Sequence, residues 1–305
     1  MRPLVIGSVA YDSVETPFGH ATDLLGGSAT YFSLASALFS PARIVAVVGH
    51  DFRSTDTQLF QSRGIDVSGL EQLPGKTFRW GGKYHTNMNI RDTLFTELNV
   101  FAEFVPKLSD EHRNAKFVFL ANIAPKLQLE VLQQVTAPRF VACDTMNFWI
   151  NGPQRQDLIT LLAKVDCLII NDEEAELLTG VPGVVRAANL ILKAGPSIVI
   201  IKRGEHGALV FSENDVFYVP AYPLESVIDP TGAGDTFAGG IMGYLAGIGD
   251  VSPRTLRQAT VVGSLLASFC VEDFGIGALL RVDAEAIAAR YRRMAEIVQF
   301  EPLPL

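Results

Sequence analysis

Short apolar runs rich in β-branched residues recur along the chain. They span residues 4–9, 44–48, 117–120, 140–142, 167–170 and 198–201. Their hydrophobicity is continuous rather than alternating, which is typical of strands buried on both faces of a parallel sheet. Helical patterns at 28–39, 127–135 and 158–163 lie between several of these runs. The alternation predicts a doubly wound α/β layer sandwich.

The last third of the chain has a different pattern. Residues 208–211 and 216–219 predict a β-hairpin, and three helices are expected after it. The first spans 236–246 and ends at a glycine cap. The second begins with Ser252 as N-cap and Pro253 at the first helical position, and continues to about Val271. Asp283 is the expected cap of the third.

One long segment does not fit the α/β alternation. Residues 76–100 are polar, aromatic and rich in strand-forming residues, without a helical pattern. We interpret them as strands outside the main sheet that pair with residues 13–24 to make a small lid, although an ordinary surface excursion is the alternative. A loop of this length in a compact domain is usually functional or disordered, and aromatic content argues against disorder. We therefore expect a single domain, 1–305, with a lid from about 13–24 and 76–100.

Composition narrows the class of protein. The chain has 305 residues, of which 48% are hydrophobic and 19% charged, so it can bury a large core. Its net charge of −8 argues against general nucleic-acid binding, because an acidic surface repels phosphate backbones. Three cysteines and five scattered histidines indicate neither a disulfide framework nor a zinc site. The apolar stretches are too short to cross a membrane. We expect a cytoplasmic protein without membrane or nucleic-acid partners.

The most informative segment is Asp229-Pro-Thr-Gly-Ala-Gly-Asp235, directly before a predicted helix. Gly232 and Gly234 allow the backbone to approach a ligand closely. The amides of a helix N-terminus point at the same place and make an anion hole suited to a transferred phosphoryl group. Asp235 lies at the helix mouth, where it can accept a proton from an attacking hydroxyl. The segment therefore predicts phosphoryl transfer.

Other phosphate-binding signatures are absent from the sequence. No G-x-x-x-x-G-K-[ST] motif occurs, and Phe237 takes the place of the third glycine of a dinucleotide fingerprint. A simple turn and helix cap is the structural alternative. The complete run, with an aspartate at each end and small residues at 238–240, favours function.

This segment closely resembles the second signature of the PfkB (ribokinase-like) family of carbohydrate kinases. Four shorter matches precede this segment, in the order that the family pattern has. They are Gly26-Gly27-Ser28-Ala29-Thr30, Val48-Gly49-His50-Asp51-Phe52, Asn171-Asp172-Glu173-Glu174 and Lys202-Arg203-Gly204-Glu205-His206-Gly207-Ala208. Each match alone is weak, but their order and spacing extend the resemblance over nearly the whole chain. It implies a ribokinase-like three-layer α/β/α sandwich with a mostly parallel central sheet and a small β lid.

The resemblance also implies roles for individual residues. Asp235 would be the catalytic base, and Gly232, Ala233 and Gly234 would supply anion-hole amides. Asn171 and Glu174 would organise Mg²⁺ through water near the phosphates of ATP, and Asp229 is a candidate ligand for a monovalent cation such as K⁺. The nucleotide side would comprise Asn171, Lys202, Gly204, Thr231, Gly232 and Gly234. The substrate side would comprise Asp12, Gly26, Gly27 and Tyr31, with Asp144 and Asn147 as further candidates.

Several of these residues also have plain structural readings. Asp12 is equally expected as a turn residue at the end of the first strand, Glu174 as a solvated carboxylate, and Lys202 as a strand cap. His85 and Arg91 lie in the predicted lid, where a lone side chain is more often surface than ligand. Trp80, Tyr84 and Phe95 could instead pack a homodimer interface, as lids of related proteins often do.

The substrate loop departs from the ribokinase pattern. Ribokinase-type loops read G-G-x-x-x-N, whereas Tyr31 takes the asparagine position here. We therefore expect an ATP-dependent kinase acting on a hydroxyl of a sugar or sugar-like alcohol, without assigning ribose. A nucleoside (adenosine-like) or inositol kinase is the alternative among enzymes. A non-catalytic sugar- or nucleotide-binding regulator is the alternative from another class, and the intact Asp235 segment argues against it.

Overall fold

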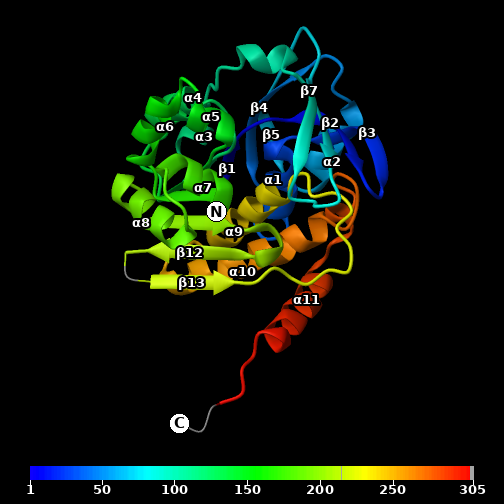
Figure 1. Ribbon diagram of the computed structural model, residues 1–305. Coiled ribbons are helices and arrows are strands. Elements are labelled where there is room, and N and C mark those ends of the chain that lie inside the picture. Colours follow the sequence, from blue (N-terminus) through cyan, green and yellow to red (C-terminus); the bar gives the residue numbers. More distant parts are fainter. Residues whose placement is uncertain (214, 303–305) are drawn as a thin grey trace.

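A nine-stranded sheet forms the centre of the computed structural model, which describes residues 1–213 and 215–302 (Figure 1). The strand order is β13-β12-β11-β10-β9-β8-β1-β4-β5. The strands are β1 (Leu4–Ile6), β4 (Arg43–Gly49), β5 (Asp66–Leu73), β8 (Phe117–Leu120), β9 (Phe140–Asp144), β10 (Cys167–Asn171), β11 (Ile198–Lys202), β12 (Ala208–Ser212) and β13 (Asp215–Val219). Pairing is parallel from β5 to β11 and antiparallel only for β11–β12 and β12–β13. The predicted mostly parallel sheet is confirmed.

Helices cover both faces of this sheet, because successive strand residues enter different cores. Val5 and Ile200 join one apolar cluster, whereas Leu4 and Ile201 join another. The first cluster includes residues of α1 (Ser28–Ala37), α2 (Ser54–Ser62), α9 (Ala233–Ile248), α10 (Pro253–Cys270) and α11 (Ala284–Ile297). The second includes residues of α4 (Pro125–Gln134), α5 (Asn147–Asn151), α6 (Arg155–Leu162), α7 (Asp172–Thr179) and α8 (Val184–Ala194). The predicted three-layer sandwich is therefore confirmed. The remaining helices are short: η1 (Asn99–Glu103), α3 (Asp110–Arg113), η2 (Gly204–His206) and η3 (Leu279–Arg281).

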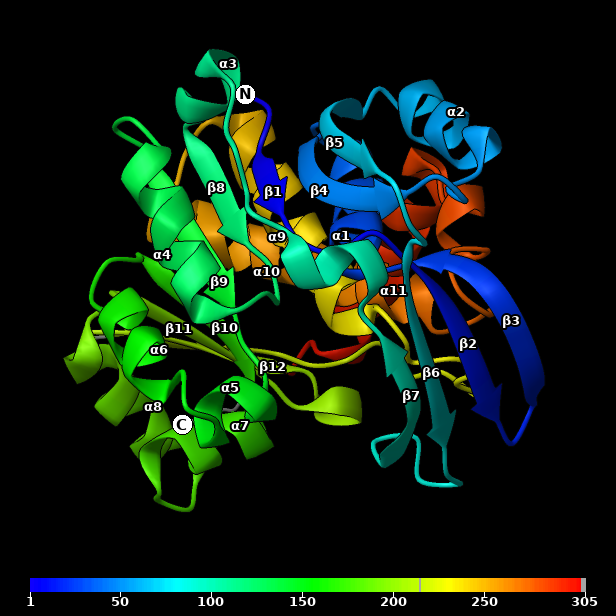
Figure 2. The same ribbon diagram turned by 90° about the horizontal axis from the view of Figure 1, so that it is seen from above.

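A second, four-stranded sheet projects beside the central one (Figure 2). Its order is β3 (Gly19–Gly26), β2 (Ala10–Thr16), β6 (Phe78–Tyr84) and β7 (Arg91–Glu97). The β2–β6 pair is parallel, and the outer pairs are antiparallel. Strands β6 and β7 come from the segment that did not fit the α/β alternation, and β2 and β3 include the residues expected to pair with it.

The first predicted strand is wrong in its extent. The run 4–9 does not form one strand: β1 ends at Ile6, and Asp12 lies inside β2 rather than at the end of the first strand. The cause is a reciprocal contact in which the Ser28 amide donates to Ser8 Oγ (3.0 Å) and the Ser8 amide donates to Ser28 Oγ (3.1 Å). These bonds hold the chain at the start of α1, so that it leaves the central sheet after Gly7.

The predicted C-terminal helices are present with the predicted caps. Ser252 Oγ accepts from the Thr255 amide (3.4 Å), and Asp283 Oδ1 accepts from the Ala286 amide (2.8 Å). Helix α9 begins at Ala233, three residues before the predicted start, because the glycine turn itself leads into the helix. The sequence pattern did not predict β5, since this edge strand is only half-buried and contains no apolar run.

None of the helices in the described part of the chain is long and apolar enough to cross a bilayer alone. Helices α7 and α8 meet the criteria of length and composition only as a pair, across a bend of 60°.

Glycines allow α9 to pack very closely against α1. A Cβ added at Gly239 would overlap the backbone carbonyl of Phe32, and one at Gly243 would lie 2.7 Å from Ser36 Cα. Backbone atoms cannot move aside as a flexible side chain can. The close approach fixes the start of α9, which carries the Asp229–Asp235 segment, against the start of α1, which carries the di-glycine loop.

We expect Gly239→Ala to lower the free energy of unfolding by about 1–3 kcal/mol, because overpacking outweighs the better helix propensity of alanine. Urea denaturation would measure the loss. Gly247→Ala, near the exposed end of the same helix, is the matched control and should stay within about 1 kcal/mol of wild type. Equal stability of Gly239→Ala and wild type would contradict the close packing.

Candidate active site

Three predicted site residues lie at the carboxyl ends of neighbouring parallel strands. Asp144 ends β9, Asn171 ends β10 and Lys202 ends β11, and Asn171 pairs directly with Lys202 in the strand register. Ligands commonly bind at this edge of an open α/β sheet. Lys202 Nζ lies 3.6 Å from Asp144 Oδ2, and both side chains are largely buried. Burial lowers the pKa of Lys202, but Asp144, Glu174 and Asp235 together raise it, so the ammonium stays charged.

The Asp229–Asp235 segment forms a tight turn into α9. Gly232 is the N-cap residue with φ 74°, a conformation that favours glycine, and a Cβ there would overlap the Tyr31 ring. Tyr31 is fully buried beneath this turn. The Gly234 amide has no acceptor within the described residues, and Lys202 Nζ would be the nearest atom to a Cβ at Gly234, at 2.8 Å. The turn therefore offers an amide and an ammonium to the same small volume, as an anion requires.

Two carboxyl groups, those of the buried Asp12 and the half-buried Asp235, flank this volume. Burial raises the pKa of Asp235, in the first turn of α9, to about 7; Asp144 adds to the rise and Lys202 opposes it. Burial also raises the pKa of Asp12 to about 7. The Gly27 amide donates to Asp12 Oδ2 (3.3 Å), and this hydrogen bond opposes the rise. The negative charges of Asp229 and Asp235 add to the rise in the pKa of Asp12, whereas the charge of Arg91 opposes it. Both groups can exchange protons near neutral pH.

The di-glycine loop brings the backbone against Asp12. Gly26 ends β3, and a Cβ at this position would overlap the Asp12 carboxylate. Gly27 is the N-cap residue of α1, with φ 90°. The loop thus places a carboxylate and close backbone groups side by side, which suits a ligand with neighbouring hydroxyl groups.

Asp229 holds two loops together. Its Oδ1 accepts from the Thr231 amide and its Oδ2 from the Gly275 amide, both at 2.9 Å, and the side chain is buried. Burial raises the pKa of Asp229 although these amides oppose the shift.

Asn171 and Glu174 form a capping box at the start of α7. Asn171 Oδ1 accepts from the Glu174 amide (2.7 Å), and Glu174 Oε2 accepts from the Asn171 amide (3.2 Å). Burial raises the pKa of Glu174 to about 7, as does the charge of Asp144, whereas Lys202 lowers it. The N-x-x-E match therefore coincides with an ordinary capping pattern.

The second sheet contributes residues that the sequence reasoning did not assign to the site. Tyr84 is buried, and its hydroxyl lies 3.2 Å from Thr231 Oγ1. Arg91 pairs with Tyr84 across β6 and β7, and its charge lowers the pKa of Asp12, Glu174 and Asp235. The only sequence signal was the strand alternation, which places Arg91 and Tyr84 on one face once their register is known.

Two predicted residues lie at the margin of this cluster. Asn147 is exposed at the start of α5. Gly204, with φ 51°, packs against Asn89 of the β6–β7 connection, and Asn89 Nδ2 donates to Glu205 Oε2 at 2.6 Å. The second sheet therefore contacts the loop after β11 as well as the Thr231 turn.

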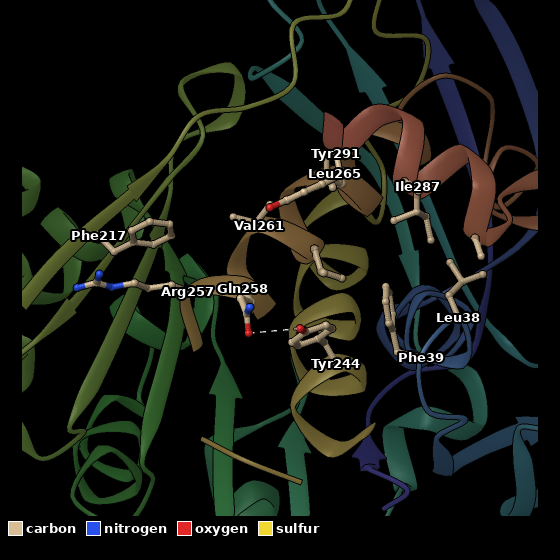
Figure 3. Close-up of a pocket in the computed structure, with 13 residues that line it drawn as sticks. Leu38, Phe39, Phe217, Tyr244, Arg257, Gln258, Val261, Leu265, Ile287 and Tyr291 are labelled. Atoms are coloured by element: carbon tan, nitrogen blue, oxygen red, sulfur yellow. Dashed lines mark hydrogen bonds between the residues drawn. The ribbon is translucent and has the colours of Figure 1, made fainter. Parts of the chain in front are cut away.

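An apolar groove of about 470 Å³ lies elsewhere, between α1, α9, α10, α11 and β13 (Figure 3). Phe39, Tyr244, Val261 and Ile287 line it, and Tyr244 donates to Gln258 Oε1 at 3.4 Å. None of the predicted site residues lines this groove.

Buried carboxyl groups around an anion-binding turn, at the carboxyl edge of a parallel sheet, define a class of phosphotransferases. The model of the pfkB family of carbohydrate kinases matches residues 7–281, and the chain belongs to this family. It is an ATP-dependent carbohydrate kinase that transfers a phosphoryl group to a hydroxyl of a sugar or sugar-like alcohol.

Similar proteins fit this family. The chain is 31% identical to cytidine kinase of Thermococcus kodakarensis over 279 residues, covering 89% of this chain and 96% of that protein. It is 36% identical to inositol 3-kinase of Arabidopsis thaliana over 293 residues, covering 90% and 75%. The structure of Methanocaldococcus jannaschii nucleoside kinase superposes with a TM-score of 0.76 at 18% identity, covering 96% and 99%.

We expect Lys202→Met to destabilise the protein by about 3 kcal/mol at pH 8.5, because it leaves the buried Asp144 carboxylate without its partner. The substitution raises the pKa of Asp144 further, and a carboxyl with a raised folded-state pKa loses stability as pH increases. The loss should shrink at about pH 5.5, because a carboxyl with a raised pKa is protonated more completely as the pH falls. Thermal unfolding at both pH values would measure it, with the exposed Lys164→Met as control. A pH-independent loss would contradict the ion pair.

Proposed function

We propose that Asp235 is the general base that accepts the proton of the acceptor hydroxyl. The supporting observation is its place in the first turn of α9, beside the Gly232–Gly234 turn and close to Asp12. Its pKa of about 7 leaves a large fraction ionised at neutral pH. The acceptor oxygen would attack the γ-phosphorus of ATP, its proton would pass to Asp235, and the bond to the β-phosphate oxygen would break to release ADP.

The acceptor would bind beside Asp12, Gly26 and Gly27, with Tyr31 supporting the turn from below. The carboxyl groups of Asp12, Asp229 and Asp235 surround this position and would repel a phosphorylated acceptor. We therefore propose an uncharged polyol with neighbouring hydroxyl groups, held by the Asp12 carboxylate and the adjacent backbone. Asp144 would act through Lys202, and the exposed Asn147 would contact only the margin of a bound ligand.

The donor would lie along the β10 and β11 strand ends. Lys202 and the amides of Gly232, Ala233 and Gly234 would surround the γ-phosphate, and Thr231 and Gly204 would line the nucleotide side. The Ala233 amide already donates to the Pro230 carbonyl (3.2 Å), so Gly234 would make the stronger contact. This arrangement positions the phosphates without a broad basic surface.

Mg²⁺ fits the oxygen-bearing side chains at the start of α7. The capping box occupies Asn171 Oδ1 and Glu174 Oε2, so these residues would hold the ion mainly through water, as Mg²⁺ prefers. Bound Mg²⁺ would neutralise phosphate charge. Asp229 would be the ligand of a monovalent cation such as K⁺, together with carbonyl groups of the loops that it joins.

A nucleoside acceptor is the second candidate. The aromatic side chains Trp80 and Tyr84 lie on the site-facing side of the second sheet, where a base could pack, and the likeness to a cytidine kinase is consistent with this acceptor. The likeness to an inositol 3-kinase supports a cyclitol instead. We further propose that the second sheet acts as a lid. Its exposed strand β7 would pair with a second copy of the chain to give a homodimer. We also propose that the enzyme is cytoplasmic.

Asp235→Asn should reduce kcat by at least about 1,000-fold, because the amide cannot accept the proton. Nucleotide affinity should change less than about threefold, since the anion-hole amides remain. ADP release and isothermal titration with ATP would measure the two effects. Asp157→Asn, in α6 away from the site, is the matched control. Wild-type turnover of Asp235→Asn would rule out this base.

A panel of acceptors should identify the class of acceptor and test whether it is uncharged. We expect turnover with uncharged sugars, nucleosides or inositols and at least about 100-fold lower kcat/KM with their phosphorylated counterparts, because of the carboxyl groups around the site. ADP release would be recorded for ribose, deoxyribose, cytidine, adenosine, myo-inositol and one sugar phosphate. Preference for the phosphorylated acceptor would contradict an uncharged substrate.

A further inference from the structure

The arginine on the second sheet is held in a defined place. Arg91 begins β7 and lies opposite Tyr84 of β6. Its guanidinium carbon is 5.1 Å from the centre of the Trp80 ring, a distance at which the cation interacts with the ring face. The Trp80 ring in turn covers Gly82, where a Cβ would overlap it. Glycine at 82 thus lets the indole lie flat along the strand and support the guanidinium.

The same arginine shares a face of the second sheet with Tyr84, which contacts the turn before α9. Tyr84, its cross-strand partner, reaches Thr231 Oγ1 (3.2 Å), directly before the Gly232 turn. The charged groups around this point are Asp12 from β2, Asp229 and Asp235 from the α9 turn, Asp144 and Lys202 from the strand ends, and Glu174 from α7. Asp12, Glu174 and Asp235 each respond to the charge of Arg91, although they come from different sides of the site. Because its cross-strand neighbour Tyr84 contacts the turn before α9, the exposed Arg91 side chain lies on the face of the second sheet that meets the site.

We propose that Arg91 is a catalytic residue that contacts the phosphoryl group during its transfer from ATP to the acceptor. Lys202 and the Gly234 amide bind that group from the α9 side, and Arg91 binds it from the second sheet. The inference rests on the proposed phosphotransfer at Asp235 and adds a residue to it.

Charge makes this second cation necessary. Five carboxyl groups surround the site, and within the described residues Lys202 is the cation that lies among them at the strand ends. The transferred group carries its charge on three oxygens, and a planar guanidinium can donate to two of them at once. Arg91 lies on the second sheet and Lys202 on the central one. The transferred group can therefore contact both cations only where the two sheets meet.

The test uses Arg91→Gln and Arg91→Lys in the full chain. Arg91→Gln should lower kcat about 100-fold, the effect of removing one donor to the reacting group. Arg91→Lys should lower it about 10-fold, because lysine keeps the charge and loses the fork. KM for the acceptor should change less than threefold. Lys83→Gln is the matched control: Lys83 precedes Tyr84, so it lies on the other face of β6, where it pairs with Glu15 at 3.2 Å, and its loss should change kcat less than twofold.

A binding measurement distinguishes this role from a structural one and does not need an acceptor. Aluminium fluoride mimics the phosphoryl group in transfer, so the wild type should bind ADP and Mg²⁺ more tightly when it is added. In Arg91→Gln, the increase in ADP affinity caused by aluminium fluoride should be at least tenfold smaller than in wild type. The affinity of this variant for ADP alone should stay the same. An equal gain in Arg91→Gln, a gain absent from wild type, or a loss confined to the acceptor KM would overturn the proposal. Failure of the wild type with every acceptor in the panel would instead count against the proposed function.

Discussion

The site depends on one buried ammonium group among carboxylates. Lys202 contacts Asp144 directly and influences Glu174 and Asp235, which come from two further elements. An uncompensated buried charge costs several kcal/mol, so these groups must be placed together or protonated. At Glu174 and Asp235 burial outweighs the charge of Lys202, which raises the pKa of each carboxyl to about 7. Further positive charge would stabilise these carboxylates, and under the proposed function the metal ion of a bound nucleotide would supply it.

The placement of these groups follows from how two short segments leave the sheet. The Ser8–Ser28 contacts turn the chain out of β1 and deliver Asp12 to the second sheet. The Gly239 and Gly243 contacts hold α9 against α1, so the Gly232 turn, Tyr31 and Gly27 become neighbours. The packing of α1 against α9 thus sets the distance between Asp12, beside the di-glycine loop, and Gly234, in the turn that begins α9.

Much of this arrangement could be predicted from the sequence. Buried parallel strands produce continuous apolar runs, and the Asp229–Asp235 segment combines glycines with a helix start, so local chemistry indicates both the sheet and the turn. Other features depend on tertiary contacts that leave no local pattern. Edge strand β5 is half-buried, and Asp12 enters β2 because Ser8 contacts Ser28, which lies twenty residues further along the chain. The position of Arg91 depends on its register with Tyr84 and on Trp80 lying over Gly82.

The acidic character of the chain has a consequence for how the kinase can close. With a net charge of −8 and several buried carboxyl groups, ATP gains little from long-range attraction and must be bound by short-range contacts. Short-range donors are effective only when water is excluded, since screening weakens them in an open cleft. The second sheet meets both needs, because Tyr84 reaches the Thr231 turn and Asn89 reaches the loop at Glu205. Under the proposed mechanism, a sheet held at these two points would exclude water over the phosphates and supply Arg91, so that closure and charge compensation would be one event.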